Sequence, residues 1–287
     1  MTLLQSLLHL TNFKSPLLRT LVPSISAAYA IQLAFAVPSI LAQNEQFYDF
    51  SGSLTFLSVT ALSLCLPSVR TRYSPASTNA SASLPSRLVS FAGPGALNWR
   101  QIALSGAVVL WAVRLGSYLF KRIVQDGKDS RFDEIKKSPV RFGVAFFAQA
   151  TWVSLCLLPI VTLNSVPSTV FAALSPIKVS DTLGLLIYLG GFAFEITADW
   201  QKSQWLRERR DKIHDEQFMT RGLWSISIVG LLSGVAMSYV SPAFVSLLLL
   251  KVSGVPLSEK KYDERYGNRK DYQEWKRNTP KLFPKLM

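Results

Sequence analysis

The sequence predicts an all-α fold, a polytopic bundle of membrane helices with about six transmembrane segments. Hydrophobic residues make up 49% of the 287 residues and charged residues only 17%, a composition shifted away from that of soluble domains. Apolar runs of about 20 residues, long enough for a hydrocarbon core of about 30 Å, recur along the chain. Lys and Arg gather beside these runs, as they do in the cytoplasmic loops of membrane proteins. These observations disfavour the alternative of a soluble helical bundle.

Six apolar runs account for the predicted crossings. In chain order they are Leu18 to Ala42, Tyr48 to Val69, Ile102 to Ile123, Val144 to Leu163, Leu183 to Trp200 and Leu223 to Leu250. The last run has about 28 residues, which is more than one crossing requires and too few for two. It is therefore either one tilted helix or a re-entrant hairpin.

Three segments rich in Lys and Arg set the expected topology. They begin at Lys121, Lys202 and Lys251, and the positive-inside rule places all three in the cytoplasm. The Ser/Pro-rich loop from Arg70 to Trp99 then falls on the lumenal side, where its glycosylation sequon at Asn79 is accessible. A single crossing by the last run sends the basic tail to the lumen, against its charge. We favour this tilted helix, because a hairpin at membrane depth needs protein around it.

Several function classes find little support in the composition. The net charge of +13 is explained by topology and not by nucleic acid, because no aromatic residues interleave with the basic ones as in a strand-binding groove. Cys65 and Cys156 lie inside apolar runs, and neither a disulfide framework nor a zinc-ligand spacing is present. With two histidines, His9 and His214, the chain offers almost no material for histidine-based metal or triad chemistry.

The first group of candidate residues lies in "GGFAFEITADWQKSQWLRE". Glu195, Asp199 and Lys202 fall on one helical face over two turns. An ionisable group at membrane depth costs several kcal/mol, so it normally faces the protein interior and has a partner. We expect Glu195 to face the interior, with a basic or polar partner between Arg114 and Arg122. The alternative is a polar pair that only specifies helix packing.

The second group lies in "WAVRLGSYLFKRIVQDGKDSRFDEI". Arg114, Tyr118 and Arg122 follow i, i+4, i+8 spacing and form a polar stripe on an apolar helix. Arginine suits phosphate or carboxylate, so the stripe either pairs with an acidic residue or holds the phosphates of a cofactor. Asp129 and Arg131 follow at the cytoplasmic surface, either as cofactor contacts or as an ordinary charged loop.

The third group lies in the basic tail, which mixes Tyr and Trp with Lys and Glu. By its charge the tail is attracted to anionic lipid headgroups. Glu259, Tyr262 and Tyr266 either reach a cavity that faces the cytoplasm or belong to a solvated amphipathic helix.

With these motifs the sequence resembles the steroid 5-alpha-reductase C-terminal superfamily, in particular its fungal branch, domain of unknown function 1295. The matching motifs are "WAVRLGSYLFKRI", "GKDSRF", "FEITADWQK", "GLWSIS", "SPAFVSLLLLKVSGVPLSEKKYDERYG" and "TPKLFP". The resemblance begins near residue 98. It implies an N-terminal transmembrane pair with its loop over residues 1–97 and a reductase-like membrane domain over residues 98–287.

The resemblance implies a multi-pass enzyme of the endoplasmic reticulum that binds NADPH between its helices. Such enzymes reduce a carbon–carbon double bond conjugated to a carbonyl in a steroid or other lipid. The partners are then the bilayer and a lipophilic small molecule, with no nucleic acid; the substrate, the proton donor and the oligomeric state stay open. By position, the resemblance assigns Glu195, Asp199, Lys202 and Arg114 to the cofactor site. Together with the candidates from the residue patterns, the predicted cofactor-binding residues are Arg114, Tyr118, Arg122, Asp129, Arg131, Glu195, Asp199, Lys202, Trp224, Glu259, Tyr262 and Tyr266.

The chain departs from the resembling family after Ser227. In relatives "GLWSIS" continues into an "RHPNYFGE"-like polar turn at the cofactor site and a further transmembrane stretch, whereas here "IVGLLSG" follows directly. The missing crossing explains why the basic tail falls on the unexpected side, and it leaves catalysis open. Two alternatives therefore stand beside the reductase: a membrane methyltransferase of the isoprenylcysteine or phospholipid type, and a non-catalytic membrane protein.

Overall fold

The chain forms two compact units, Met1–Ser175 and Pro176–Met287, which are described separately. The computed structural model describes residues 3–73, 97–129, 131–213, 259, 262–264 and 266–278. Within these ranges the regular secondary structure is helical, without any β-strand. The division expected between residues 97 and 98 follows family motifs and not packing, and it stays a prediction.

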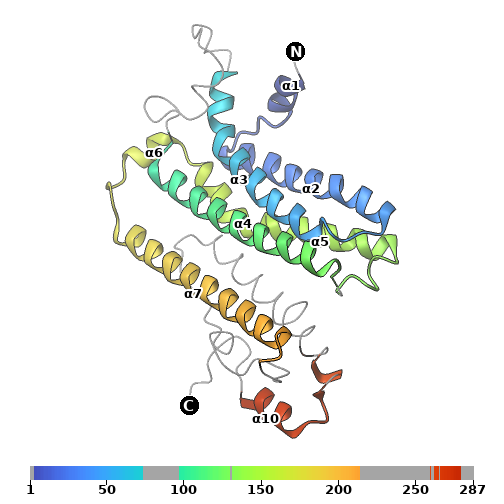
Figure 1. The fold of residues 1–287 in the computed structure, drawn as a ribbon. Coiled ribbons are helices and arrows are strands. Elements are labelled where there is room, and N and C mark those ends of the chain that lie inside the picture. The colour runs from blue at the N-terminus through green and yellow to red at the C-terminus, as the bar shows by residue number, and fades with distance from the viewer. Residues whose placement is uncertain are drawn as a thin grey trace. The chain divides into compact units, whose positions relative to one another are not determined.

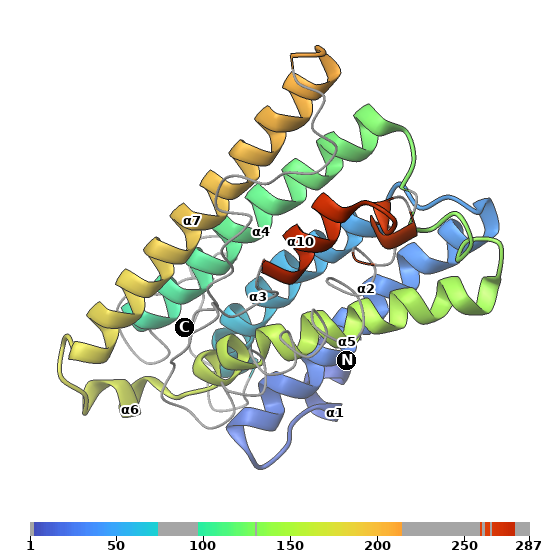
Figure 2. The same ribbon diagram turned by 90° about the horizontal axis from the view of Figure 1, so that it is seen from below.

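The first unit is built on four long helices that run side by side (Figures 1 and 2). Its helices are α1 (Leu3–Leu10), α2 (Pro16–Ala42), α3 (Tyr48–Arg72), α4 (Trp99–Asp126), α5 (Pro139–Asn164) and the short α6 (Ser168–Ala172). Helix α2 packs against α3 and α5, and α3 also packs against α4 and α5. Because successive long helices run in opposite directions, α2 and α4 end where α3 and α5 begin.

Five of the described helices are long and apolar enough to cross a membrane: α2 to α5, and α7 (Val179–Arg210) of the second unit. They confirm the first five predicted runs and the prediction of a polytopic helical bundle. The sixth run, Leu223 to Leu250, lies outside the described residues, as do Asn79 and most of its loop.

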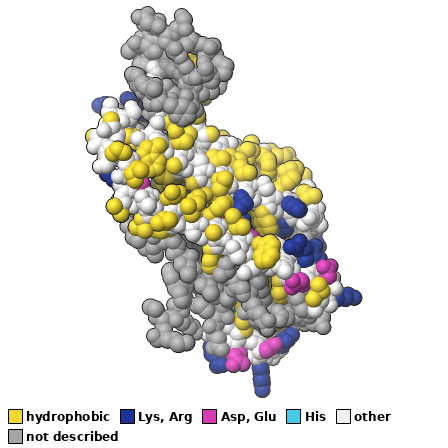
Figure 3. Space-filling view, turned by 60° about the vertical axis from the view of Figure 1, so that its left-hand side comes forward, with side chains coloured by type: hydrophobic (Ala, Val, Ile, Leu, Met, Phe, Trp, Pro, Cys, Tyr) yellow, Lys and Arg dark blue, Asp and Glu magenta, His cyan; other side chains and the backbone are white. Residues whose placement is uncertain are grey.

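The surface of the four-helix bundle is apolar where a soluble protein would be polar. Hydrophobic side chains cover a broad area of the described surface in Figure 3. Leu33, Leu41 and Phe147 expose 64%, 81% and 62% of their surface, whereas Val59 and Val153 in the bundle interior are buried. Large exposed apolar patches indicate a partner surface. For helices of this length, the partner is the hydrocarbon of a bilayer.

Small and polar residues hold the bundle together, as is typical of helix contacts inside membranes. Gly116 of α4 lies against Ser53 of α3, so close that a Cβ added to the glycine would lie 2.6 Å from the Cβ and the Oγ of Ser53. Between α2 and α3, the buried Gln32 side chain donates a hydrogen bond of 2.8 Å to the Thr55 hydroxyl. Close backbone approach and buried hydrogen bonds therefore replace the hydrophobic driving force that lipid does not supply.

The ends of α4 are set by its flanking residues. Asn98 accepts a hydrogen bond of 3.0 Å from the Arg100 amide, and Gln101 accepts one of 2.9 Å from the Asn98 amide. This reciprocal capping starts the helix earlier than the predicted run. At the other end Gly127 adopts a left-handed conformation with φ of 73°, which glycine takes without strain. The chain thereby leaves the helix and enters the loop that carries Asp129 and Arg131.

In the second unit, α7 is longer than the predicted run. Its 32 residues span about 48 Å at about 1.5 Å per residue, more than the hydrocarbon thickness of about 30 Å. The helix continues past Trp200 to Arg210 because neither Pro nor Gly interrupts this stretch. The basic last turn therefore extends beyond the apolar part. A further short helix, α10 (Lys270–Asn278), lies in the tail.

Candidate functional site

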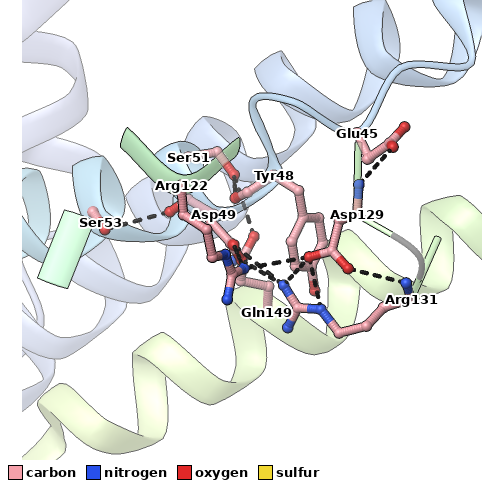
Figure 4. Close-up of polar contacts among 9 residues, drawn as sticks. All are labelled: Glu45, Tyr48, Asp49, Ser51, Ser53, Arg122, Asp129, Arg131 and Gln149. Atoms are coloured by element: carbon pink, nitrogen blue, oxygen red, sulfur yellow. Dashed lines mark hydrogen bonds and ion pairs between the residues drawn. The ribbon is translucent and has the colours of Figure 1, made fainter. Parts of the chain in front are cut away.

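Six ionisable side chains meet at one end of the four-helix bundle of the first unit, and we call this group the charged end. Figure 4 draws all of them except Lys136. Its members are Glu45 of the α2–α3 loop, Asp49 of the first turn of α3, Arg122 near the end of α4, and Asp129, Arg131 and Lys136 of the α4–α5 loop. Elements far apart in the sequence thus contribute to one cluster.

Two carboxylates and two guanidinium groups form the centre of the charged end. The Asp49 Oδ2 lies 3.2 Å from the Nη2 of both Arg122 and Arg131. The Asp129 Oδ2 lies 3.4 Å from the Nη2 of Arg122 and 2.8 Å from the Nε of Arg131 (Figure 4). Each arginine is shared by both carboxylates, so the start of α3, the end of α4 and the following loop are joined by charge-assisted hydrogen bonds.

Glu45 joins the α2–α3 loop to the same cluster. Its side chain is almost completely buried, with 4% exposed. One carboxylate oxygen accepts a hydrogen bond of 2.8 Å from Lys136, and the other accepts one of 3.2 Å from the Asp129 amide. A buried carboxylate is stable only when such bonds replace its water. Both loops at this end are therefore fixed to each other.

The charged end keeps its groups ionised. Burial raises the pKa of the Glu45 carboxyl, but hydrogen bonds from Lys136 and from the Asp129 amide more than offset this, so the pKa is below its ordinary value. Burial likewise raises the pKa of Asp129, and bonding to Arg131 lowers it further than burial raises it. Burial lowers the pKa of Arg131, while its bond to Asp129 raises it to a net increase. All three pKa shifts thus favour the ionised forms of Glu45, Asp129 and Arg131.

Aromatic side chains pack next to these charges. The Tyr48 ring lies 4.6 Å from the Phe132 ring and 5.0 Å from the Phe146 ring, and its hydroxyl donates a hydrogen bond of 3.0 Å to the Ala145 carbonyl. Phe132 is buried. In the "GKDSRF" motif, glycine therefore ends the helix, the aspartate and arginine form ion pairs, and the phenylalanine anchors the loop in the core.

The structure brings together three of the predicted site residues, Arg122, Asp129 and Arg131. Arg114 and Tyr118 are half-buried on the same stripe of α4, two turns and one turn before Arg122, respectively. The sequence analysis missed the acidic residues of the α2–α3 side and Lys136. Alternation of the predicted crossings was a usable signal, because it places residues 43–47 and 127–138 at the same end of the bundle.

The α7 residues Glu195, Asp199 and Lys202 lie on one helical face, as predicted, and all three are half-buried. They belong to the second unit, so the expected partner of Glu195 between Arg114 and Arg122 stays a prediction. Trp224 lies outside the described residues.

The described tail residues gather around α10. The Lys276 ammonium lies 3.8 Å from the Glu259 carboxylate. The Tyr266 ring centroid lies 6.1 Å from that of Tyr262 and 6.2 Å from that of Tyr272, which is buried. Glu259, Tyr262 and Tyr266 therefore take part in a small aromatic and ionic cluster of the tail itself. Their predicted contact with a cofactor stays a prediction.

Comparison with known proteins identifies one family. The family model described as "Protein of unknown function (DUF1295)" matches residues 80–228 and 226–279, which together make up more than half of the chain. The two matched segments meet at residues 226–228, where the sequence analysis places the missing turn after Ser227. No curated protein and no solved structure matches the chain.

Proposed function

The protein belongs to the DUF1295 family, and we propose that it is a membrane-embedded reductase-like protein of the endoplasmic reticulum that binds NADPH. Its substrate is the C=C bond of a lipophilic enone, such as a steroid or another lipid. The observation that carries the proposal is the meeting of Arg122, Asp129 and Arg131 at the charged end, since all three are among the cofactor-binding residues predicted from the sequence. Family membership alone supplies no activity.

The two arginines of the charged end fit a phosphate group. A guanidinium has five N–H donors. Among the described residues, Arg122 donates its hydrogen bonds through Nη2 alone, and the Arg131 side chain donates through Nε and Nη2. Their side chains are 37% and 50% exposed. Donors on the exposed side of this pair can therefore bind phosphate oxygens while Asp49 and Asp129 keep the guanidinium groups in place.

In the proposed reaction, bound NADPH would supply the hydride for the β-carbon of the conjugated double bond, and a proton from a donor that stays open would complete the reduction at the α-carbon. The residues of this chain would bind and orient the cofactor: the arginines at the charged end would hold its phosphates. The resemblance separately assigns Glu195 of α7 to cofactor binding. The apolar helices admit a substrate that is dissolved in the bilayer and exclude water from the reacting atoms.

We further propose that this chain lacks a family segment after Ser227, so that turnover is lost or much weaker than cofactor binding. The meeting of the two matched segments at residues 226–228 supports this. The test is the gene and transcript sequence around codon 227. An in-frame exon for an "RHPNYFGE"-like turn and one further apolar stretch supports a shortened transcript; an uninterrupted reading frame shows instead that the gene itself lacks the segment.

Cofactor binding by the purified full-length chain tests the function class. Fluorescence or calorimetric titration should give NADPH binding, with S-adenosylmethionine as the competing ligand. Binding of S-adenosylmethionine without NADPH would overturn the proposal in favour of a membrane methyltransferase. Binding of neither ligand would favour a non-catalytic membrane protein.

A variant on α7 separates a cofactor role from a packing role. Glu195→Gln should lower NADPH affinity about tenfold, the loss of about 1.4 kcal/mol expected for one charged hydrogen bond, with little change in folded yield. Glu208→Gln makes the same chemical change in the last turns of the same helix and serves as the control. Equal losses of affinity and folded yield in Glu195→Gln would assign the residue to helix packing.

A further inference from the structure

A cavity of about 280 Å³ lies at the opposite end of the same bundle. Its walls come from the starts of α2 and α4, the end of α3, and residues 164–168 at and after the end of α5. We call this end of the bundle the arginine end, because Arg19 and Arg70 line the cavity. The volume is near the lower limit of about 300 Å³ for small-molecule pockets. It therefore has room for a compact polar group but not for a whole lipid.

The lining of this cavity is positively charged. Arg19 and Arg70 both contribute to it, and none of the described residues around it is Asp or Glu. The Arg70 Nη2 donates a hydrogen bond of 3.1 Å to the Arg19 carbonyl, so the two residues are neighbours. Two neighbouring guanidinium groups without a carboxylate repel each other unless an anion lies between or beside them. The cavity therefore favours an anionic ligand.

The hydrogen bonds of these arginines leave donors for such a ligand. The two terminal amino groups of Arg70 bond the carbonyls of Leu8, Thr11 and Arg19 at 2.8 to 3.1 Å and the Thr11 hydroxyl at 2.6 Å. In the part of the chain that the structure describes, the Arg19 guanidinium makes one hydrogen bond, from Nε to the Phe13 carbonyl. Both terminal amino groups of Arg19, which is half-buried, therefore remain for an anion.

Two buried polar atoms in the walls point to the same conclusion. The Arg70 Nε and the Asn164 Oδ1 are buried and have no hydrogen-bonding partner among the described residues. Asn164 is held in place by its amide nitrogen, which donates to the hydroxyls of Ser63 at 2.9 Å and Ser105 at 3.2 Å. Buried polar atoms in proteins are almost always paired. Neither atom has accessible surface, so neither contacts a ligand directly. The unbonded Nε leaves the charge of Arg70 incompletely compensated behind the wall, which favours an anion in the cavity.

The position of the cavity matches the headgroup layer of a membrane. All four of the helices that meet there are long and apolar enough to cross the bilayer, and the cavity lies at their ends. Trp99, the first residue of α4, is half-exposed, and tryptophan is typical of the membrane–water boundary. Leu18 is exposed on the first turn of α2, and Leu104 is exposed on the second turn of α4. A headgroup in the cavity would thus have apolar surface beside it for its acyl chains.

From these observations we propose that the arginine end binds the phosphate-bearing headgroup of an anionic membrane lipid. The guanidinium of Arg19, with that of Arg70 behind it, binds the phosphate oxygens. The acyl chains lie outside the cavity, along the apolar surface of α2 and α4. This proposal is independent of the reductase reading, because no residue of the charged end takes part.

Thermal unfolding of the purified full-length chain in mixed micelles tests the proposal. Phosphatidylglycerol should raise Tm by about 5 °C relative to phosphatidylcholine, the stabilisation expected from a ligand well above its Kd. The variant Arg19→Gln should lose at least half of this rise. The control Arg141→Gln removes an exposed arginine at the charged end and should keep it. Native mass spectrometry should show phosphatidylglycerol retained on the wild type and on Arg141→Gln, but less on Arg19→Gln.

Three outcomes would overturn the proposal. The first is an equal rise in Tm with the two lipids, which would remove the requirement for an anion. The second is an equal loss of the lipid-induced rise in Tm in Arg19→Gln and Arg141→Gln, which would show a general effect of surface charge. The third is a rise of the same size with inorganic phosphate alone, which would assign the cavity to a soluble anion. Arg70→Gln is less informative, because it also releases the carbonyls of the N-terminal segment.

Discussion

The two ends of the four-helix bundle hold their arginines in opposite ways. At the charged end, Arg122 and Arg131 are paired with Asp49 and Asp129, and Lys136 is paired with Glu45. At the arginine end, Arg19 and Arg70 donate to backbone carbonyls, and no described carboxylate lines the cavity. The first end neutralises its own charge, whereas the second keeps two net positive charges.

This difference predicts that the two ends bind anions with different strength. A compensated network stabilises loops and offers a ligand only the donors on its exposed side. An uncompensated pair of guanidinium groups is costly by itself and gains most from an external anion. Basic residues counted together in a sequence thus have different roles according to whether the fold supplies their counterion.

The largest expected effect is the presence or absence of a glycan at Asn79, which tests which end of the bundle faces the lumen. Our topology places Asn79, in the loop after α3, on the same side as the arginine end, so a glycan should be attached there in cells. The shift in electrophoretic mobility should disappear after glycosidase treatment and in Asn79→Gln. An unmodified Asn79 in a well-expressed protein would indicate the opposite orientation, with the arginine end in the cytoplasm and the charged end in the lumen.

The same assay decides the side of the tail. In the Asn79→Gln background, Lys270→Thr makes the exposed Asn268 an acceptor sequon and leaves Gly267 in place, where an added Cβ would lie 2.5 Å from the Asp263 carbonyl oxygen. We expect modification, because one crossing by residues 223–250 places the tail in the lumen. A folded, unmodified variant would favour the re-entrant hairpin.

Breaking the charge balance at the charged end should cost the most stability. Lys136→Met leaves the Glu45 carboxylate, 4% exposed, without its ammonium partner. We expect a loss of about 3 kcal/mol in the free energy of unfolding. The neighbouring variant Lys137→Met breaks an exposed pair with Glu134, with side chains 66% and 78% exposed, and should cost under about 0.5 kcal/mol. Equal losses on unfolding in mixed micelles would show that Lys136 has no special role.

A packing variant tests the contact between α3 and α4 through the free energy of unfolding in mixed micelles. Gly116→Ala introduces a Cβ that would lie 2.6 Å from Ser53, so we expect a loss of about 2 kcal/mol from overpacking. Gly106→Ala on the same helix meets nothing within 4 Å and should stabilise by about 0.5 kcal/mol through helix propensity. An equal loss of unfolding free energy in the two variants would show that the cost comes from the α4 backbone and not from the contact with α3.

The smallest expected effect is a pH dependence that distinguishes the ends. Glu45 and Asp129 have folded pKa values below their ordinary values of 4.5 and 3.8. Their stabilisation is therefore fully present above these ordinary values and is lost as the pH falls through the lower folded values. The Tm difference between wild type and Glu45→Gln should stay constant from about pH 7 to pH 5 and narrow below about pH 4. A constant difference over the whole range would contradict the role of the ionised carboxylate.

The membrane helices could be predicted because each apolar run exceeds the hydrocarbon thickness, and their exact ends could not. Helix α4 begins before its apolar run because Asn98 and Gln101 cap it, and α7 continues past Trp200 because strong helix formers follow. Apolar content says where a helix meets lipid. Capping and propensity decide where the helix stops.

The candidate site was predictable where its residues share one segment. Arg122, Asp129 and Arg131 lie within ten positions and share recognisable motifs. Their acidic partners are remote in the sequence: Asp49 is 73 residues from Arg122, and Glu45 is 84 residues from Asp129. The arginine end requires four helix ends to converge. Such pairings become visible only when the packing of the helices is known.

The hydrogen bonds of Arg70 also determine when the N-terminus becomes fixed during biogenesis. Helix α1 and the turn after it depend on this guanidinium, which bonds the carbonyls of Leu8 and Thr11. A ribosome releases residues 3–14 long before Arg70, and Arg70 reaches its place only after the second crossing has inserted. Until then the hydrogen bonds from Arg70 to the amino-terminal segment cannot form. The order of insertion, and not the order of synthesis, decides when the first residues of this protein reach their final position.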